Sequence, residues 1–397
     1  MEESLTQSPT QSPSQRSAIQ GAPDLDAGML TLSEEERLNQ AAKDPYPWIM
    51  SRNIDLIFVC GGLFWALYLV LAATGFKVDL FGGPTAFIFA AISILGVHAF
   101  GDGHQIATMY RVYQSAPTRK VLGAKVAIVG LIALATGMST LLWHETSQFW
   151  VKLVLAWGIQ HQLAQSYGIA LVYCYKRKYY MNQHEKGVMH FMVQSAMVYL
   201  ILRMFAFDAF GNYTINHVDY AFERLVPAWL SHTALGVTLA SLAYFAYIVY
   251  AKAKRDKQMF PIPGLMVLMT LIVMPFVAQE RFVLVWVAFS TTFFHTTQYL
   301  VVTSAYYFKE RGLPADVSYH KISSMLKRPV AWGYFGLLFG IGFTMAYLLP
   351  NWMIQYGQVE QAYAFASVYV FVNIHHFITD MYIWKLRDPY VQKLLVA

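Results

Sequence analysis

The stretch "VAWGYFGLLFGIGFTMAYLL" at residues 330–349 contains no charged residue. A helix needs about 20 mostly apolar residues to cross the hydrocarbon core of a bilayer. A second stretch of this kind, "LIFVCGGLFWALYLVLAATG", occupies residues 56–75. Hydrophobic residues make up 56% of the 397 residues and charged residues only 13%, whereas soluble domains carry about 25% charged residues. The sequence therefore predicts an integral membrane protein built as an all-α bundle of transmembrane helices.

About ten segments are long and apolar enough to be candidate spans. They lie at residues 54–75, 84–105, 121–143, 149–174, 187–207, 228–251, 262–279, 281–307, 330–349 and 361–384. All but five of the 29 Lys and Arg residues fall in the loops that such a topology places on one side. Because short cytoplasmic loops are enriched in Lys and Arg, we expect a multi-pass protein of the bacterial inner membrane with both termini in the cytoplasm. The net charge of +6 then reflects topology, and no nucleic-acid partner is expected.

Residues 1–48 differ in composition from the rest of the chain, since they are rich in Ser, Gln, Pro and Gly and show no apolar periodicity. Such a composition is typical of disorder. We therefore expect a disordered cytoplasmic tail at 1–48 and a transmembrane domain at 49–397. The two cysteines, Cys60 and Cys174, lie within apolar segments and form neither a disulfide framework nor a CxxC metal motif.

Four predicted spans carry a histidine followed four positions later by a polar residue. The pairs are His98 and Asp102, His161 and Gln165, His295 and Tyr299, and His376 and Asp380. Residues at i and i+4 lie on one face of a helix. At about 1.5 Å of rise per residue, the histidines fall at overlapping depths in the middle or cytoplasmic half of the membrane. The pattern predicts a polar centre shared by four helices.

Metal binding is the function that we expect of this centre. A single membrane histidine often only donates a hydrogen bond to a neighbouring helix, but ionisable residues inside a membrane generally mark a site or pathway, and neutral imidazole is a common metal ligand. The candidate ligands are His98, His104, His161, His295, His375 and His376. The candidate orienting or catalytic groups are Asp102, Gln165, Tyr299 and Asp380. Because His375 and His376 point about 100° apart on a helix, they need not bind the same ion.

The apolar residues around the centre indicate a substrate that arrives through lipid, such as a carotenoid, an isoprenoid or a fatty acyl chain. A histidine-rich iron site with open positions suits the activation of dioxygen. We expect a membrane-bound oxygenase with one or two irons, with haem and zinc as alternative cofactors. Membrane lipids are expected partners, and this chemistry allows an electron-donor protein as a further one.

Histidines spread singly over several transmembrane helices resemble the layout of the bacterial and archaeal membrane β-carotene dioxygenases related to bacteriorhodopsin-related protein. That resemblance implies four dispersed histidines holding one iron near a carotenoid tunnel. A looser similarity links the chain to membrane fatty-acid hydroxylases and desaturases, although the doublet at residues 375–376 has no upstream partner and residues 98 and 104 are six apart. The chain also resembles certain polytopic bacterial proteins, and this resemblance implies no particular function. It rests on the strings "DGHQ" (102–105), "HQLAQSYG" (161–168) and "HHFITDMYIWK" (375–385).

Three other classes of function stay open from the sequence. A haem-binding electron carrier would use two facing histidines but would not explain the acidic residues at i+4. A proton-coupled transporter would also place His and Asp at mid-depth, usually in two matching halves with broken helices. A non-catalytic subunit of a membrane complex is the third alternative.

Overall fold

The computed structural model describes residues 47–73, 96–206, 212–215, 218–221, 225–277, 290–319 and 321–396. The predicted disordered tail at 1–48 lies almost wholly outside these residues. So do most of the predicted span at 84–105 and parts of the spans at 262–279 and 281–307.

The described chain is helical, as predicted, apart from one short antiparallel hairpin. Its main helices are α4 (Gly62–Ala73), α6 (Asp102–Gln114), α7 (Ala116–Leu142), α8 (His144–Lys176), α9 (Gln183–Ala206), α10 (Ala228–Asp256), α11 (Ile262–Val277), α12 (Thr296–Glu310), α13 (Pro329–Phe343), α14 (Leu349–Gly357), α15 (Gln361–Ile383) and α16 (Pro389–Leu395). The shorter helical segments are α3 (Arg52–Ile54), the π-helical segments η2 (Asp55–Val59), η3 (Val97–Gly101) and η7 (Thr344–Leu348), and the 3-10 helix η6 (Ile322–Lys327). The hairpin pairs β1 (Asn212–Ile215) with β2 (Val218–Ala221).

Four described helical segments are long and apolar enough to cross a membrane, namely α7, α9, α10 and the run from α13 to α14. A fifth results if the pair at Arg52–Val59 and Gly62–Ala73, bent by 50°, is counted as one span. The structure thus bears out a chain with several apolar spans, while the count of ten and the sides of the termini stay predictions.

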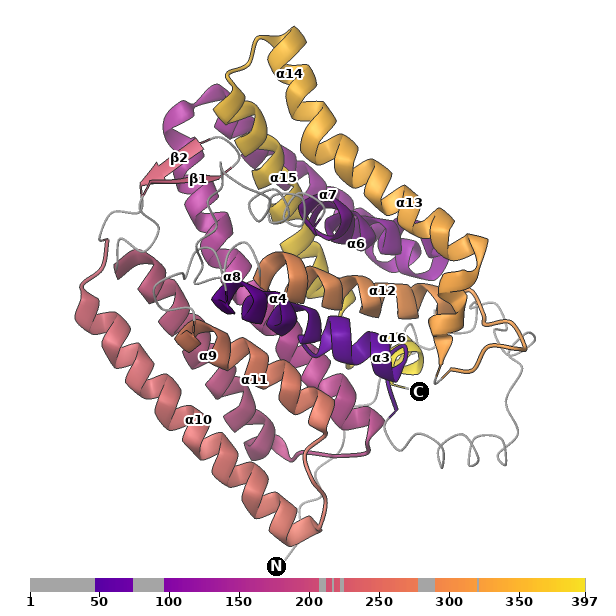
Figure 1. Ribbon diagram of the computed structural model, residues 1–397. Helices are drawn as coiled ribbons and strands as arrows, with labels where there is room; N and C mark the ends of the chain where they lie inside the picture. The colour runs from indigo at the N-terminus through magenta and orange to yellow at the C-terminus, as the bar shows by residue number, and fades with distance from the viewer. Residues whose placement is uncertain are drawn as a thin grey trace, which may run out of the picture.

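The helices form an interior group covered by outer ones. In Figure 1, α10 and the α13–α14 pair lie at opposite edges of the bundle, with α12 and α15 between them. Helix α15 packs against α6, α7 and α8, while α13 packs against α6, and α10 packs against α9. The interior helices are therefore the ones that bring distant parts of the sequence together.

Burial follows the same division. Every residue of α12 from Thr296 to Lys309 is buried, whereas α7 buries only one stripe at three- and four-residue spacing, which consists of Val126, Val129, Ala133, Gly137 and Thr140. Such a stripe is the single inward face of a helix. Since the predicted centre lies on the interior helices, the outer helices separate its polar side chains from the surface of the bundle.

The segment η2 begins at a buried carboxyl group, that of Asp55. It accepts hydrogen bonds from the backbone amides of Ile49 (2.6 Å) and Met50 (3.0 Å) and from the hydroxyl of Tyr173 (2.7 Å). Asp55 therefore has a structural role in holding the start of the chain against α8.

Candidate functional site

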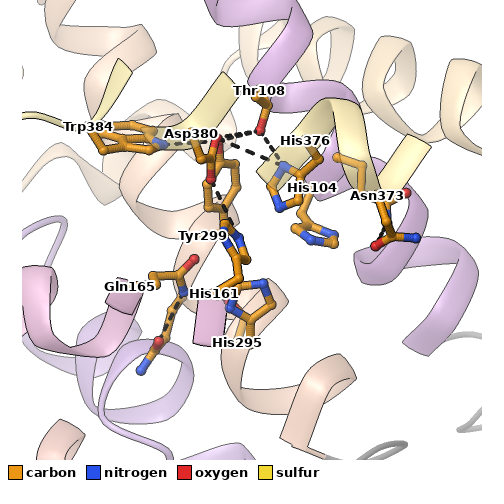
Figure 2. A network of polar contacts seen from close by, with 12 residues as sticks. His104, Thr108, His161, Gln165, His295, Tyr299, Asn373, His376, Asp380 and Trp384 are labelled. Carbon is orange, nitrogen blue, oxygen red and sulfur yellow. Dashed lines mark hydrogen bonds and ion pairs between the residues drawn. The ribbon is translucent and has the colours of Figure 1, made fainter. Parts of the chain in front are cut away.

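Four buried histidines from four helical segments meet inside the bundle (Figure 2). They are His104 of α6, His161 of α8, His295 directly before α12, and His376 of α15. None is more than 7% exposed. The structure therefore brings together four of the six histidines that the sequence singles out.

The four imidazoles form a closed circuit of neighbours. The ring of His376 lies 4.7 Å from that of His104 and 4.6 Å from that of His161, between ring centroids. The ring of His295 lies 5.3 Å from His104 and 5.1 Å from His161. One ligand-type atom each of His104, His295 and His376 falls within 4.8 Å of the others, and the same holds for His161, His376 and Asp380. These are two groups of three potential ligands, and His376 belongs to both.

A backbone contact determines which nitrogen of His104 can bind a ligand. Its Nδ1 lies within hydrogen-bond distance of the carbonyl oxygen of Gly101. A carbonyl only accepts hydrogen bonds, so the proton of the neutral ring resides on Nδ1. The lone pair is then on Nε2, which is the usual arrangement for a ligating imidazole.

Thr108 sets the tautomer of His376 in the same way. The hydroxyl of Thr108 donates to Oδ1 of Asp380 (2.9 Å), and its oxygen lies 2.7 Å from Nδ1 of His376. With its only proton given to the carboxylate, Thr108 can accept a hydrogen bond only if Nδ1 of His376 is protonated. The Nε2 lone pair of His376 is therefore available.

Asp380 is the common partner of this network. Its Oδ1 also accepts a hydrogen bond from the hydroxyl of Tyr299 (2.7 Å), and that hydroxyl in turn accepts one from Nε1 of Trp384 (3.1 Å). The other oxygen, Oδ2, lies 3.6 Å from Nε2 of His161. A carboxyl held in this manner beside imidazoles is the arrangement that orients metal-binding histidines.

Three ring nitrogens of the cluster have no hydrogen-bond partner although they are buried, namely Nε2 of His161, Nδ1 of His295 and Nε2 of His376. Buried polar atoms are nearly always paired, so each exception calls for a physical explanation. A cation bound among the rings would supply the missing partner for all three.

Most of the polar residues at i+4 bond to partners on other helices, and not to the histidine four positions before them. The side-chain amide of Gln165 donates to the backbone oxygen of His295 (2.9 Å) and to Oε1 of Gln298 (3.1 Å) instead of bonding to His161. Tyr299 bonds to Asp380 rather than to His295. Among the three pairs whose side chains are both described, His376 and Asp380 are the pair that stays together, at 3.9 Å and through Thr108.

Of the remaining candidates, His375 and Asp102 lie outside the circuit. His375 is directed toward α7, since its ring atoms Cδ2 and Nε2 would lie 3.6 and 3.7 Å from a Cβ placed on Gly130. Asp102 is buried where α6 meets Gly342 of α13. The backbone of His98 belongs to η3, but its side chain falls outside the described part of the structure, so its role stays a prediction.

Two residues of the network, Thr108 and Trp384, are not among the candidates predicted from the sequence. Thr108 follows His104 by four positions, and Trp384 follows Asp380 by four. Applying the i and i+4 spacing to every polar residue of these spans, rather than to one histidine each, would have identified both.

Two cavities adjoin the cluster. One, of about 340 Å³, is lined by His104, His161 and His295, and by polar groups that include Gln105 and Asn373. The other, of about 230 Å³, is lined by His161, Tyr299, Asp380 and Trp384 among mainly apolar side chains. In Figure 2, Asn373 lies on one side of the histidines and Trp384 on the other.

Comparison with protein-family models, with curated proteins and with solved structures gives no match for this chain.

Proposed function

We propose that this chain is an integral membrane metal-dependent oxidoreductase, of the oxygenase type, that acts on a lipid-soluble substrate. The proposed ligands are His104, His161, His295 and His376, and iron is the proposed metal. The observation that carries the proposal is the closed circuit of four buried imidazoles, in which three ring nitrogens lack a hydrogen-bond partner.

The donor set favours iron over the alternative cofactors. Imidazole nitrogen is a common donor to Fe, Zn and Cu, and sites with histidine, carboxylate and open positions are typical of non-haem iron oxygenases. The rings lie 4.6 to 5.3 Å apart around the circuit, which leaves no space among them for a porphyrin. Bound iron would supply the activation of dioxygen.

The chain's own residues would orient the ligands and manage protons. Asp380, through Thr108, fixes the ring of His376, and its second oxygen faces His161. The hydroxyl of Tyr299, hydrogen-bonded to Asp380, is a proton donor beside the smaller cavity. Buried apolar residues such as Phe377 and Val172 keep water from this region, which strengthens the electrostatic interactions within it.

We further propose that the full chain crosses the bacterial inner membrane about ten times, with both termini in the cytoplasm. The support is the one-sided distribution of Lys and Arg, together with the four to five candidate spans among the described helices.

The decisive test is the metal content of the purified protein, measured per chain, for the wild type and a matched pair of variants. The adjacent histidines provide that pair, because His376 belongs to the circuit and His375 does not. We expect near-stoichiometric iron in the wild type and in His375→Ala, and at least a tenfold loss in His376→Ala with an unchanged circular dichroism spectrum.

The absence of metal from wild-type protein, even after anaerobic addition of Fe²⁺ and Zn²⁺, would contradict the proposal. Equal loss in both variants would show that the circuit is not the site. A colourless protein containing zinc would retain the metal site but contradict the oxygenase chemistry.

A further inference from the structure

The two cavities beside the cluster follow one another along three separate helices. On α8, the larger cavity is lined from Val154 to Gln162 and the smaller from Gln160 to Val172. The order is the same on α15, from Phe365 to Phe377 and then from Asp380 to Trp384. It recurs around α12, where Thr292 and His295 line the larger cavity and Tyr299 and Val302 the smaller. Three independent helices thus place the cavities end to end.

His161 is the residue at which they meet, since its side chain lines both. From Val154 to Val172, at about 1.5 Å per residue, the two cavities together follow α8 for about 27 Å. That length is close to the hydrocarbon thickness of a bilayer, about 30 Å. A ligand occupying both cavities must be long and narrow, and it would pass the imidazole cluster with an interior part of its chain.

The two ends differ in polarity. The larger cavity is lined by Gln105 and Asn373, whose side-chain amides are joined by a hydrogen bond of 2.9 Å, and by Asp102. The smaller cavity ends among apolar residues such as Ile169, Val302 and Leu395. Since a polar terminus is best placed beside polar groups, the ligand's hydrogen-bonding end belongs in the larger cavity and its apolar tail in the smaller.

The charge of the lining excludes one kind of lipid. Among the described residues, neither cavity is lined by Lys or Arg, whereas each is lined by a carboxyl group, that of Asp102 in one and Asp380 in the other. A lipid carboxylate at the far end of either cavity would meet no Lys or Arg among the described lining residues, and burying an unpaired charge is costly. A neutral hydroxyl can instead donate to Asp102 or bond to the amides.

We infer that the ligand of this site is a neutral, extended single-chain lipid with a terminal hydroxyl group, bound across His161 so that its interior, and not its end, faces the histidines. As a statement about a substrate this rests on the proposed function, but as a statement about binding it does not depend on any metal. The site is therefore expected to bind neutral lipid alcohols more tightly than free fatty acids.

The test uses two glycines of α8 that lie on either side of His161. Gly158 lines the larger cavity, and a Cβ there would make only an ordinary contact of 3.7 Å with Phe377. Gly168 lines the smaller cavity, and a Cβ there would have nothing within 4 Å. Phenylalanine at either position would occupy one cavity alone. Gly236 of α10 lines neither cavity and also has open space around it, so Gly236→Phe is the matched control.

The probes are cis-parinaryl alcohol and cis-parinarate, which share one fluorescent chain and differ only in the terminal group. Binding to the purified full-length protein, metal-free and metal-loaded, is followed by energy transfer from tryptophan at about pH 9, where the acid is ionised. We expect the alcohol to bind at least tenfold more tightly than the acid, and Asp102→Asn to reduce that difference. Gly158→Phe and Gly168→Phe should each weaken binding of the alcohol at least tenfold, whereas Gly236→Phe should leave it unchanged.

Acid binding as tight as alcohol binding would overturn the assignment to neutral lipids. Unchanged alcohol affinity in either α8 variant would overturn the end-to-end placement, and Val154→Phe replaces Gly158→Phe if that variant does not fold. If the alcohol binds as expected to a protein that never holds a metal, the inference on binding stands and the proposed function fails.

Discussion

The outer helix α7 and the interior helices α12 and α15 are built on opposite plans. Helix α7 exposes large apolar side chains such as Leu131 (66% exposed) and Ile128 (58%), and its buried stripe consists of small or β-branched residues. Helices α12 and α15 bury histidine, glutamine, asparagine and threonine. In these three helices, large apolar side chains are exposed on α7, whereas polar side chains are buried on α12 and α15. As described, α7 is long and apolar enough to be a candidate span and α12 and α15 are not, although the sequence predicts spans at 281–307 and 361–384.

The largest effect is expected from a charge placed on the outer face of α7, because this face is proposed to contact lipid. Leu131 lies near the middle of Ala116–Leu142, and an arginine at the centre of a membrane helix costs about 2.5–3.5 kcal/mol of insertion free energy. We expect Leu131→Arg to lower the fraction of protein that resists extraction from membranes by carbonate, and Leu131→Met to leave it unchanged. Full integration of the arginine variant would show that this face does not contact lipid.

The next largest effect is expected where the outer helix α13 packs against the interior helix α6. A Cβ on Gly342 of α13 would approach backbone atoms of Asp102 to 2.7 Å, which only a shift of α13 away from α6 could relieve. We expect Gly342→Ala to destabilise the protein by about 1–3 kcal/mol, as overpacking does, and to lower the melting temperature in detergent.

The matched control for Gly342→Ala is a substitution two residues away on the same helix. Gly340 has nothing within 4 Å of a Cβ, so Gly340→Ala should be neutral or stabilise by up to about 1 kcal/mol through helix propensity. If Gly342→Ala is no less stable than Gly340→Ala, the close approach of α13 to α6 does not limit the size of the residue at position 342.

The sequence predicts the helical class of the fold and the helices that supply the histidines, but not which side of each helix faces the cluster. The depth of the cluster in a membrane stays a prediction. Helix positions follow from apolar length, so the predicted span at 121–143 corresponds well to α7 at Ala116–Leu142. Because the predicted helices lie close to the observed ones along the sequence, four of the six candidate histidines do meet in the structure. Rotation about the helix axis is set by packing, and so neither the outward turn of His375 toward Gly130 nor the attachment of Gln165 to the backbone of His295 could be deduced. The cavities depend on the same packing.

A buried threonine, Thr108, and a partly buried one, Thr136, differ in the same way as the interior and outer helices. The hydroxyl of Thr108 connects His376, Tyr299 and Asp380, whereas that of Thr136 on α7 donates only to the carbonyl of Ala133 in its own helix (2.7 Å). We expect Thr108→Val to cost about 1–2 kcal/mol, because it leaves buried partners unsatisfied, and to weaken metal binding. Thr136→Val should change stability by less than about 0.5 kcal/mol. Denaturation in detergent measures both, and identical small effects would mean that the network around Asp380 does not stabilise the fold.

The smallest expected effect is at the edge of the network. The indole of Trp384 donates to Tyr299 (3.1 Å) and lies 3.8 Å from the guanidinium carbon of the buried Arg111, whereas Trp352 on α14 is 59% exposed. Phenylalanine preserves an aromatic face over Arg111 but cannot donate a hydrogen bond. We expect Trp384→Phe to cost about 0.5–1 kcal/mol, the net value of one hydrogen bond, and Trp352→Phe to have no measurable effect. If the two variants melt at the same temperature, the indole of Trp384 contributes only its ring, and the polar network ends at Tyr299.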